Sequence, residues 1–260
     1  DGRLSGYALG YHQGYADAVL RELAFRAPAL SGARLYSVFF GGGTPSLWEP
    51  EQLGRVLAGI RGAFGAEHPE VEITVECNPS SLDRERARAL REVGVNRLSV
   101  GVQSLDDGEL AFLGRLHDRA LAFSALEAAQ QSFERVSADL MFALPEQPTE
   151  RFIGYLDTLL GMGLSHVSAY ALTIEAATPF GERARKKLLR PAPDEAYAVM
   201  FERVQERFQQ AGFEQYEVSN YARRGEESRH NQHYWRGGSY LGLGAAAVGC
   251  LHGALDGIAT

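Results

Sequence analysis

Cysteine is scarce in this chain, and it contains no long apolar run. Cys77 and Cys250 are the only two cysteines, and they lie too far apart to match a metal-binding spacing. We interpret both as reduced thiols of a cytoplasmic protein. No apolar run approaches the roughly 18 residues that a membrane span requires, and residues 1–4 carry neither a signal-peptide core nor a basic leader. The sequence thus predicts no integral membrane segment.

Positive charge is also in short supply. The chain has 26 Lys and Arg against 33 Asp and Glu, which gives a net charge of −7. Its most basic stretch, residues 183–190, is expected to form a solvated linker or helix face. Without a long basic patch we expect no nucleic-acid partner. A hydrophobic share of 45% in 260 residues is enough for the core of one large α/β domain, with or without a small appendage.

Apolar strands and helical patterns alternate up to residue 171. Strands are expected at 35–40, 71–76, 97–101, 136–141 and 166–171, with helices at 51–64, 83–93, 119–131 and 149–162. This spacing of roughly 25 to 40 residues is the repeat of a βα unit and predicts a parallel sheet with right-handed crossovers. The strands look almost wholly apolar, so we expect both of their faces to be covered.

The two ends of the chain depart from this repeat. A helix at 12–26 comes first, so the first strand of the repeat and the loop after it are expected to be missing. After Ala171 the pattern changes to a long helix at 194–211, a strand at 215–219 and an end rich in Gly, His and aromatic residues. We therefore divide the chain into residues 1–175, the βα part, and residues 176–260, an α+β appendage.

A run of three glycines follows the first expected strand, in the segment 39–45 (FFGGGTP). Ordering three consecutive glycines is costly, and a chain accepts this where the backbone turns sharply or approaches a ligand. A helix is expected to open shortly after, near Pro50. A strand, a glycine turn and a helix together can hold a polar small molecule through backbone groups, although a plain tight turn is the simpler alternative.

Polar side chains occur where the later strands end. Glu76, Gln103 and Asp139 lie at or near strand ends, and Arg115 lies in a loop-like stretch. In parallel α/β sheets ligands bind at this edge, where carboxylates suit a diol or an amine and Arg grips a carboxylate. Simpler roles remain open: Asp139 as a helix cap or as the partner of a basic side chain, Gln103 as a partner of loop carbonyls, Arg115 in a surface ion pair. Two carboxylates at this edge could also act as the general acid and base of a glycosidase. Such a site, however, would give the glycine turn no role.

Six segments in order resemble the motifs of one radical S-adenosylmethionine (SAM) family, which contains oxygen-independent coproporphyrinogen III oxidase and the HemW-type haem chaperones. They are GGGTPS (41–46), VECNP (75–79), RLSVGVQS (97–104), LGRLH (113–117), ADLMFALP (138–145) and SAYALT (168–173). The resemblance runs from about residue 30 to residue 253. It implies an α/β fold with a parallel (β/α) partial TIM-type barrel of the radical SAM kind.

The resemblance also implies a role for each matching position. Gly42, Gly43 and Thr44 would line the methionyl amino end of SAM, and Glu76 would accept from the same end. The other implied contacts are Arg115 with the SAM carboxylate, Gln103 and Asp139 with the ribose, and Ala171 near the adenine.

The C-terminal part resembles the chaperone branch of the family. Its segment 230–235 (HNQHYW) matches a motif associated there with haem. An imidazole such as that of His230 can ligate haem iron, and neighbouring aromatic rings can pack on the porphyrin. The alternative is that His230 and Trp235 fill a hydrogen-bonded corner beneath the glycine-rich segment.

The family holds a [4Fe–4S] cluster through CxxxCxxC, and this motif is absent from the sequence. We expect either a fragment whose cluster loop lies elsewhere in a longer polypeptide, or a clusterless relative. Three function classes follow from the resemblance. They are a haem chaperone that delivers haem to an acceptor protein, an oxygen-independent coproporphyrinogen III oxidase of haem biosynthesis, and a SAM- or haem-binding module without catalysis.

Overall fold

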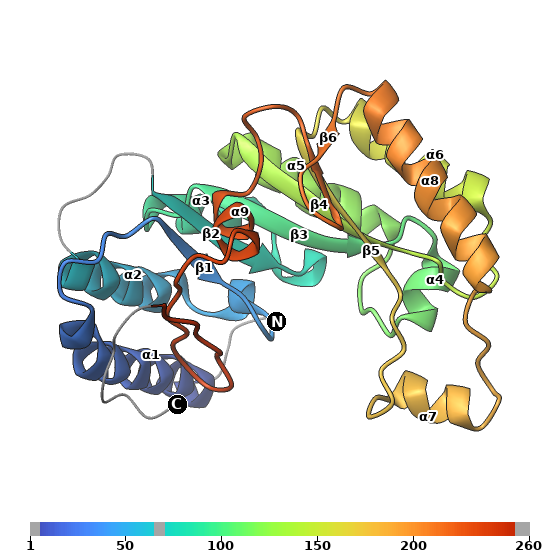
Figure 1. Cartoon of the computed structure of the whole chain (residues 1–260). Helices are drawn as coiled ribbons and strands as arrows, with labels where there is room; N and C mark the ends of the chain where they lie inside the picture. The colour runs from blue at the N-terminus through green and yellow to red at the C-terminus, as the bar shows by residue number, and fades with distance from the viewer. Residues whose placement is uncertain (1–5, 65–70, 253–260) are drawn as a thin grey trace.

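Five parallel strands form the centre of the fold. The computed structural model describes residues 6–64 and 71–252, and its strands curve into the open sheet of Figure 1. They are β1 (Ser37–Phe40), β2 (Glu72–Cys77), β3 (Arg97–Gln103), β4 (Arg135–Phe142) and β5 (His166–Ala171). Each pairs in parallel with the next. The five predicted strands are therefore confirmed, with bounds that differ by at most two residues.

Two short strands from the C-terminal part extend the same sheet. β7 (Asn220–Ala222) pairs antiparallel with β5, and β6 (Glu214–Gln215) pairs antiparallel with β7. The strand order is β1-β2-β3-β4-β5-β7-β6, so β1 and β6 are open edges among the described residues. This is an α/β fold with a partial TIM-type barrel, as the sequence predicted. The division at residue 175 stays a prediction.

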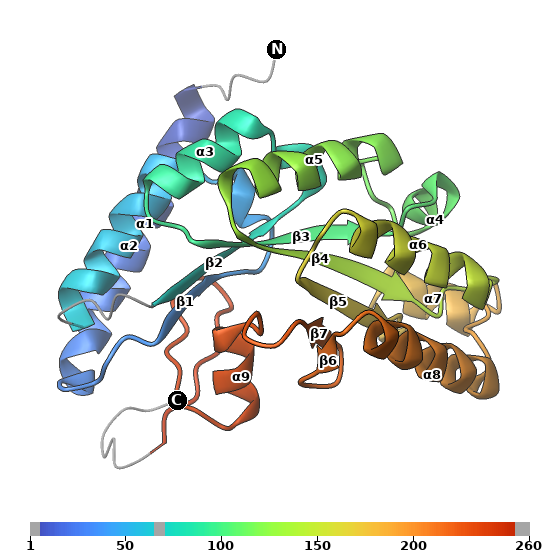
Figure 2. The same cartoon turned by 90° about the horizontal axis from the view of Figure 1, so that it is seen from above.

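Helices cover the convex face of the sheet, and one helix lies on the opposite face (Figure 2). The covering helices are α2 (Pro50–Phe64), α3 (Arg84–Glu92), α5 (Arg119–Ser132) and α6 (Thr149–Gly161), with α1 (Gly6–Arg26) beside α2 and α8 (Asp194–Gln210) beside α6. The short helices α4 (Asp107–Phe112), α7 (Pro179–Arg185) and α9 (Arg229–Trp235) were not predicted. α9 lies on the concave face, against β1 and β2. No helix of the described residues is long and apolar enough to cross a membrane.

The strands alternate between apolar and polar residues, so the expectation of strands that are apolar on both faces is wrong. Side chains such as Val75, Leu98 and Val136 pack under the helices. The opposite, concave face carries polar side chains that are buried all the same: Glu72, Thr74, Arg97, Ser99, Ser137, His166 and Ser168. The reason is the barrel shape, because the concave face borders the interior of the barrel instead of a second layer of helices.

The predicted strand at 215–219 is also wrong. Two short strands occupy this region, and a turn separates them. The carboxylate of Glu217 accepts hydrogen bonds from the Ser219 amide and from the Asn220 side chain. Such local side-chain bonds stabilise a turn at the expense of a continuous strand.

Candidate functional site

The glycine turn after β1 adopts a backbone conformation that favours glycine. Gly42 and Gly43 have φ values of +77° and +63°, in the left-handed region. A Cβ atom on either residue would meet nothing within 4 Å, whereas one on Gly41 would lie 2.5 Å from the Phe39 ring. The turn therefore needs glycine for two reasons, the conformation at Gly42 and Gly43 and a close contact at Gly41. The backbone of Gly42 and Gly43 borders open space.

Glu76 lies next to this turn, at the end of β2. The Gly42 amide donates a hydrogen bond of 3.0 Å to Glu76 Oε2. Burial raises the pKa of the Glu76 carboxyl, the nearby Asp139 adds to the shift, and the Gly42 bond opposes it. Oε1 of Glu76 has no hydrogen-bond partner among the described residues and is available to a ligand that donates, such as an ammonium group.

Asp139 lies on the same face of the sheet, two strands further along. Ser99 Oγ lies 3.0 Å from Asp139 Oδ1 and 2.8 Å from Oδ2, and Ser137 Oγ donates to Oδ1 across 3.2 Å. Burial raises the pKa of Asp139, and bonds from neighbouring serines and the charge of Arg97 oppose this shift. The carboxylate bonds to strand serines, so the alternative of a helix cap is wrong.

Gln103 and Arg115 have no polar partner for their side chains in the described part of the chain. Gln103 has φ +67° and lies where the register between β3 and β4 shifts. Its amide binds no loop carbonyl, so that alternative is wrong. Arg115 is exposed in the loop between α4 and α5. It forms no ion pair with any described residue, which removes the alternative of a surface ion pair. It lines a shallow pocket of its own with Asp107 and Asp118.

The structure thus brings some of the predicted SAM residues together and leaves others apart. Gly42 and Glu76 are joined by a hydrogen bond, and Glu76 lies close enough to Asp139 for their charges to interact. Ala171 ends β5 beside Phe142, and Thr44 follows the glycine turn. No contact joins Arg115 to the other candidates among the described residues.

A buried polar cluster that sequence reasoning missed holds the loops of Gln103 and Arg115. Ser104 Oγ donates to Glu109 Oε2 across 2.5 Å, and Gln147 Nε2 donates to the same oxygen across 3.0 Å. A ring nitrogen of His117 lies 3.0 Å from the Val102 carbonyl oxygen. Their positions in the sequence could have indicated these residues, because Ser104 and His117 each lie within two residues of a predicted SAM ligand.

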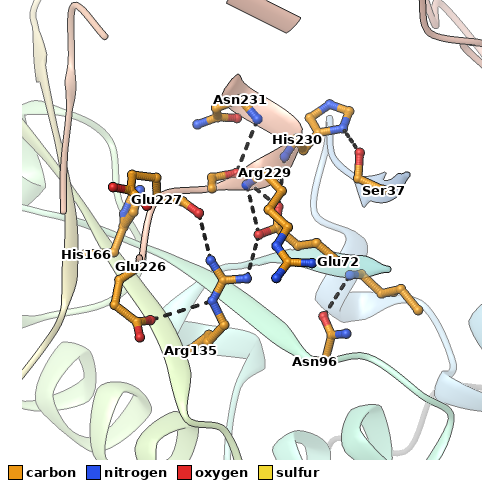
Figure 3. A network of polar contacts seen from close by, with 12 residues as sticks. Ser37, Glu72, Asn96, Arg135, His166, Glu226, Glu227, Arg229, His230 and Asn231 are labelled. Atoms are coloured by element: carbon orange, nitrogen blue, oxygen red, sulfur yellow. Dashed lines mark hydrogen bonds and ion pairs between the residues drawn. The ribbon is translucent and has the colours of Figure 1, made fainter. Parts of the chain in front are cut away.

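The second missed group is a buried carboxylate that holds α9 on the concave face (Figure 3). Glu72 accepts hydrogen bonds from the Arg229 and His230 amides, each at 3.0 Å, and from Ser228 Oγ at 3.2 Å. Arg135 Nη1 donates to Glu72 Oε2 across 2.8 Å, and its Nη2 donates to the Glu227 carbonyl across 2.7 Å. A strand residue therefore fixes the start of the HNQHYW segment.

His230 itself contacts β1. Its Nδ1 lies 3.0 Å from Ser37 Oγ, and its ring stacks on Phe39 with a centroid distance of 4.8 Å and an interplanar angle of 16°. Its Nε2 has no hydrogen-bond partner within residues 6–64 and 71–252. Trp235 is 56% exposed, so the alternative in which both residues fill a corner is wrong for Trp235.

A cavity of about 550 Å³ connects the glycine turn with α9. It lies along β1, and its lining includes Gly42, Thr44, Phe39 and Trp48 as well as His230 and His233. This volume falls in the range of small-molecule pockets, and the mixture of apolar walls with a few polar groups is typical of them. One cavity thus borders both predicted binding segments.

The residues present do not fit an iron–sulfur cluster. Within the described residues no three His, Cys, Asp or Glu side chains lie close enough to hold a metal ion. Cys77 is a buried free thiol whose pKa is raised by burial, and Cys250 is also free. The rim of the sheet, by contrast, carries groups that fit a zwitterionic amino acid and a diol.

The sequence matches the radical SAM superfamily over residues 15–159. The chain belongs to this superfamily. Membership implies SAM and a [4Fe–4S] cluster as cofactors, and it confirms that the motifs are those of a radical SAM protein.

Curated relatives support the same placement. The chain is 37% identical to the Heme chaperone HemW of Bacillus subtilis over 240 residues, covering 92% of this chain and 63% of that protein. It is 44% identical to the mitochondrial Radical S-adenosyl methionine domain-containing protein 1 of Bos taurus over 245 residues, covering 91% of this chain and 55% of that protein. The chain therefore spans less than two thirds of either relative.

A solved structure shares the fold. Coproporphyrinogen III oxidase (HemN) from Escherichia coli, a radical SAM enzyme, aligns with a TM-score of 0.76 and 22% sequence identity, covering 92% of this chain and 58% of that one. At this identity the likeness concerns the architecture alone.

Proposed function

We propose that this protein is a radical SAM haem chaperone, which binds SAM at the rim of its sheet and haem beside α9 and delivers haem to an acceptor protein. The observation that carries the proposal is the shared cavity, which borders the glycine turn at Gly42 and the helix at His230. The identity of 37% to a relative named as a haem chaperone supports it.

Each predicted SAM contact has a chemical reason. Glu76 Oε1 would accept from the ammonium group, next to the backbone of Gly42 and Gly43. Asp139 and Gln103 would bind the ribose hydroxyls. Arg115 would need to approach from its loop to bind the SAM carboxylate, with Thr44 near the methionyl end and Ala171 near the adenine. The residues described here would hold only the SAM.

His230 would hold the haem. Its Nδ1 is occupied by Ser37, and this fixes the ring so that Nε2 remains for iron. Burial lowers the pKa of His230, which keeps the imidazole in the neutral form that ligates metals. Phe39 and Trp48 supply aromatic walls of the cavity.

The test is haem titration of the purified full-length protein, followed by absorption in the Soret region. Replacing His230 with Ala should weaken haem binding by at least about tenfold, equivalent to about 1.4 kcal/mol. The control is His252→Ala, which removes an exposed histidine that does not line the cavity and should leave the affinity unchanged. Equal haem affinity in the wild type and in His230→Ala would contradict the haem site.

A second candidate function is that of an oxygen-independent coproporphyrinogen III oxidase, because the six motifs between residues 41 and 173 resemble those of the family that contains it. If the full-length protein is an oxidase, anaerobic incubation with coproporphyrinogen III, SAM and a reductant should give a vinyl-bearing product. Haem binding without such a product supports the chaperone. Binding of SAM or haem with no 5′-deoxyadenosine formed and no haem transferred would instead identify a binding module without catalysis.

A further inference from the structure

An unbroken line of hydrogen bonds crosses the concave face from the start of α9 to Asp139. The Ser228 amide lies 3.3 Å from Tyr216 Oη, and that oxygen lies 2.7 Å from His166 Nε2. On the other side of the ring, His166 Nδ1 lies 2.7 Å from Ser137 Oγ, which lies 3.2 Å from Asp139 Oδ1. Four contacts thus join the N-cap residue of α9 to a predicted ligand of the SAM ribose.

The chemistry of the groups gives this line a direction. A backbone N–H can only donate, so Tyr216 Oη accepts from Ser228, and its proton and second lone pair let it donate to His166 Nε2 or accept from it. An ionised carboxylate can only accept, so Ser137 spends its proton on Asp139 and accepts from His166 Nδ1. The Asp139 end therefore requires the tautomer of His166 with the proton on Nδ1. Tyr216 then donates to Nε2, and every donor points toward Asp139.

The surroundings of His166 suit this role. The side chain is buried, and burial together with the positive charges of Arg97 and Arg135 lowers its pKa well below the usual range. The ring is therefore neutral and has one donor and one acceptor, which fits a Ser137 that accepts and a Tyr216 that donates. A charged imidazole would have two donors and could not accept from Tyr216.

We infer that His166 is a positioning residue that ties the start of α9 to the carboxylate of Asp139, so that ligand binding at Asp139 and docking of α9 influence each other. A ligand hydroxyl that donates to Asp139 competes with Ser137 for the carboxylate lone pairs, and the change passes through His166 and Tyr216 to Ser228. By linkage, release of α9 changes the affinity at Asp139 by the same factor. The inference rests on the proposed SAM site only for the identity of this ligand.

The first test needs no ligand. Nitrogen-15 chemical shifts of the imidazole in the full-length protein report the tautomer of His166, and we expect the proton on Nδ1. In Asp139→Ala the Ser137 hydroxyl loses the carboxylate to which it donates and can donate to His166 Nδ1 instead. The preference for the Nδ1-protonated tautomer should therefore weaken. A wild-type ring with its proton on Nε2 would overturn the inference, because the line would then run in the opposite direction.

The second test breaks the line at one atom. Tyr216→Phe removes the hydroxyl that joins Ser228 to His166, and Tyr155→Phe is the matched control. Tyr155 is buried, whereas Tyr216 is partly buried, and the Tyr155 hydroxyl has no hydrogen-bond partner in the described part of the chain. We expect Tyr216→Phe to speed amide hydrogen exchange in α9 by about three- to tenfold and to weaken SAM binding by about two- to tenfold. Tyr155→Phe should change both by less than about twofold.

SAM itself provides the last comparison. Saturating SAM should change the exchange rates of the α9 amides in the wild type and in Tyr155→Phe, but not in Tyr216→Phe. If SAM binds to the wild type and these rates stay constant, the inference is wrong while the SAM site stands. If the full-length protein binds no SAM, the proposed SAM site is wrong, and the tautomer of His166 with the ligand-free exchange rates decides the inference.

Discussion

The Gly42 amide donates to the Glu76 carboxylate across 3.0 Å, and this bond fastens the glycine turn after β1 to the end of β2. The two residues are 34 positions apart in the sequence. The bond occupies one carboxylate oxygen and leaves the other without a partner among the described residues. The turn and the acid therefore form one unit, in which a change at Glu76 also affects the backbone that borders the cavity.

Glu76→Gln should weaken SAM binding and leave the protein folded. The amide oxygen of glutamine can still accept from Gly42, but the charge that attracts an ammonium group is lost. A hydrogen bond to a charged group is worth about 1.5–3 kcal/mol, or about ten- to a hundredfold in affinity. Calorimetric titration with SAM measures the loss. The control is Glu92→Gln on the exposed face of α3, where Glu92 pairs with Arg88; an equal loss there would exclude a specific role for Glu76.

Gln103→Gly should make the folded protein more stable and at the same time weaken its binding of SAM. Gln103 has φ +67°, a conformation that costs a residue with a Cβ about 1–2 kcal/mol, partly offset by the greater freedom of glycine in the unfolded chain. We expect the free energy of unfolding to rise by about 0.5–1 kcal/mol, while SAM affinity falls because the amide is gone. Lys187→Gly is the control, since Lys187 has φ +57° and does not line the cavity. It should gain similar stability with unchanged affinity, as measured by urea unfolding and SAM titration.

The sequence was sufficient to predict the parallel strands, because each onset follows a helix at the regular spacing of a βα repeat. It was also sufficient to find Gly42 and Glu76, since both lie at strand ends where the sheet presents its ligand-binding edge. α9 could not be predicted, because its seven residues lack an amphipathic repeat. What holds this helix is the carboxylate of Glu72, 156 positions away, and such a tertiary contact leaves no local pattern.

Glu72→Ala should destabilise the protein strongly. The carboxylate is almost fully buried, pairs with Arg135 at 2.8 Å and accepts from the amides of Arg229 and His230. Removing one partner of a buried ion pair costs about 3–5 kcal/mol. Chemical unfolding measures this loss. In the control, Glu226→Gln removes a carboxylate that is 38% exposed and 3.6 Å from the same arginine, and should cost less than about 1 kcal/mol. Equal losses would mean that Glu72 does not anchor α9.

Stability should fall as the pH drops below the ordinary pKa of histidine, and His166 should account for part of this fall. Burial, Arg97 and Arg135 hold the pKa of folded His166 well below 6.5, whereas the unfolded chain takes up a proton near that value. Below pH 6.5 the unfolded state thus binds more protons than the folded state at this residue. The free energy of unfolding should therefore decrease by up to about 1.4 kcal/mol per pH unit.

His166→Gln isolates this contribution, because glutamine offers a donor and an acceptor and does not titrate. Urea unfolding of both proteins between about pH 7.5 and about pH 5.5 gives two slopes to compare. His230, whose pKa is also lowered, is present in both proteins and affects both slopes alike. The wild type should lose more stability than His166→Gln over this interval. If the free energy of unfolding depends on pH equally in the two proteins, His166 has the same pKa in the folded and unfolded states. That result would contradict a neutral ring held between Ser137 and Tyr216.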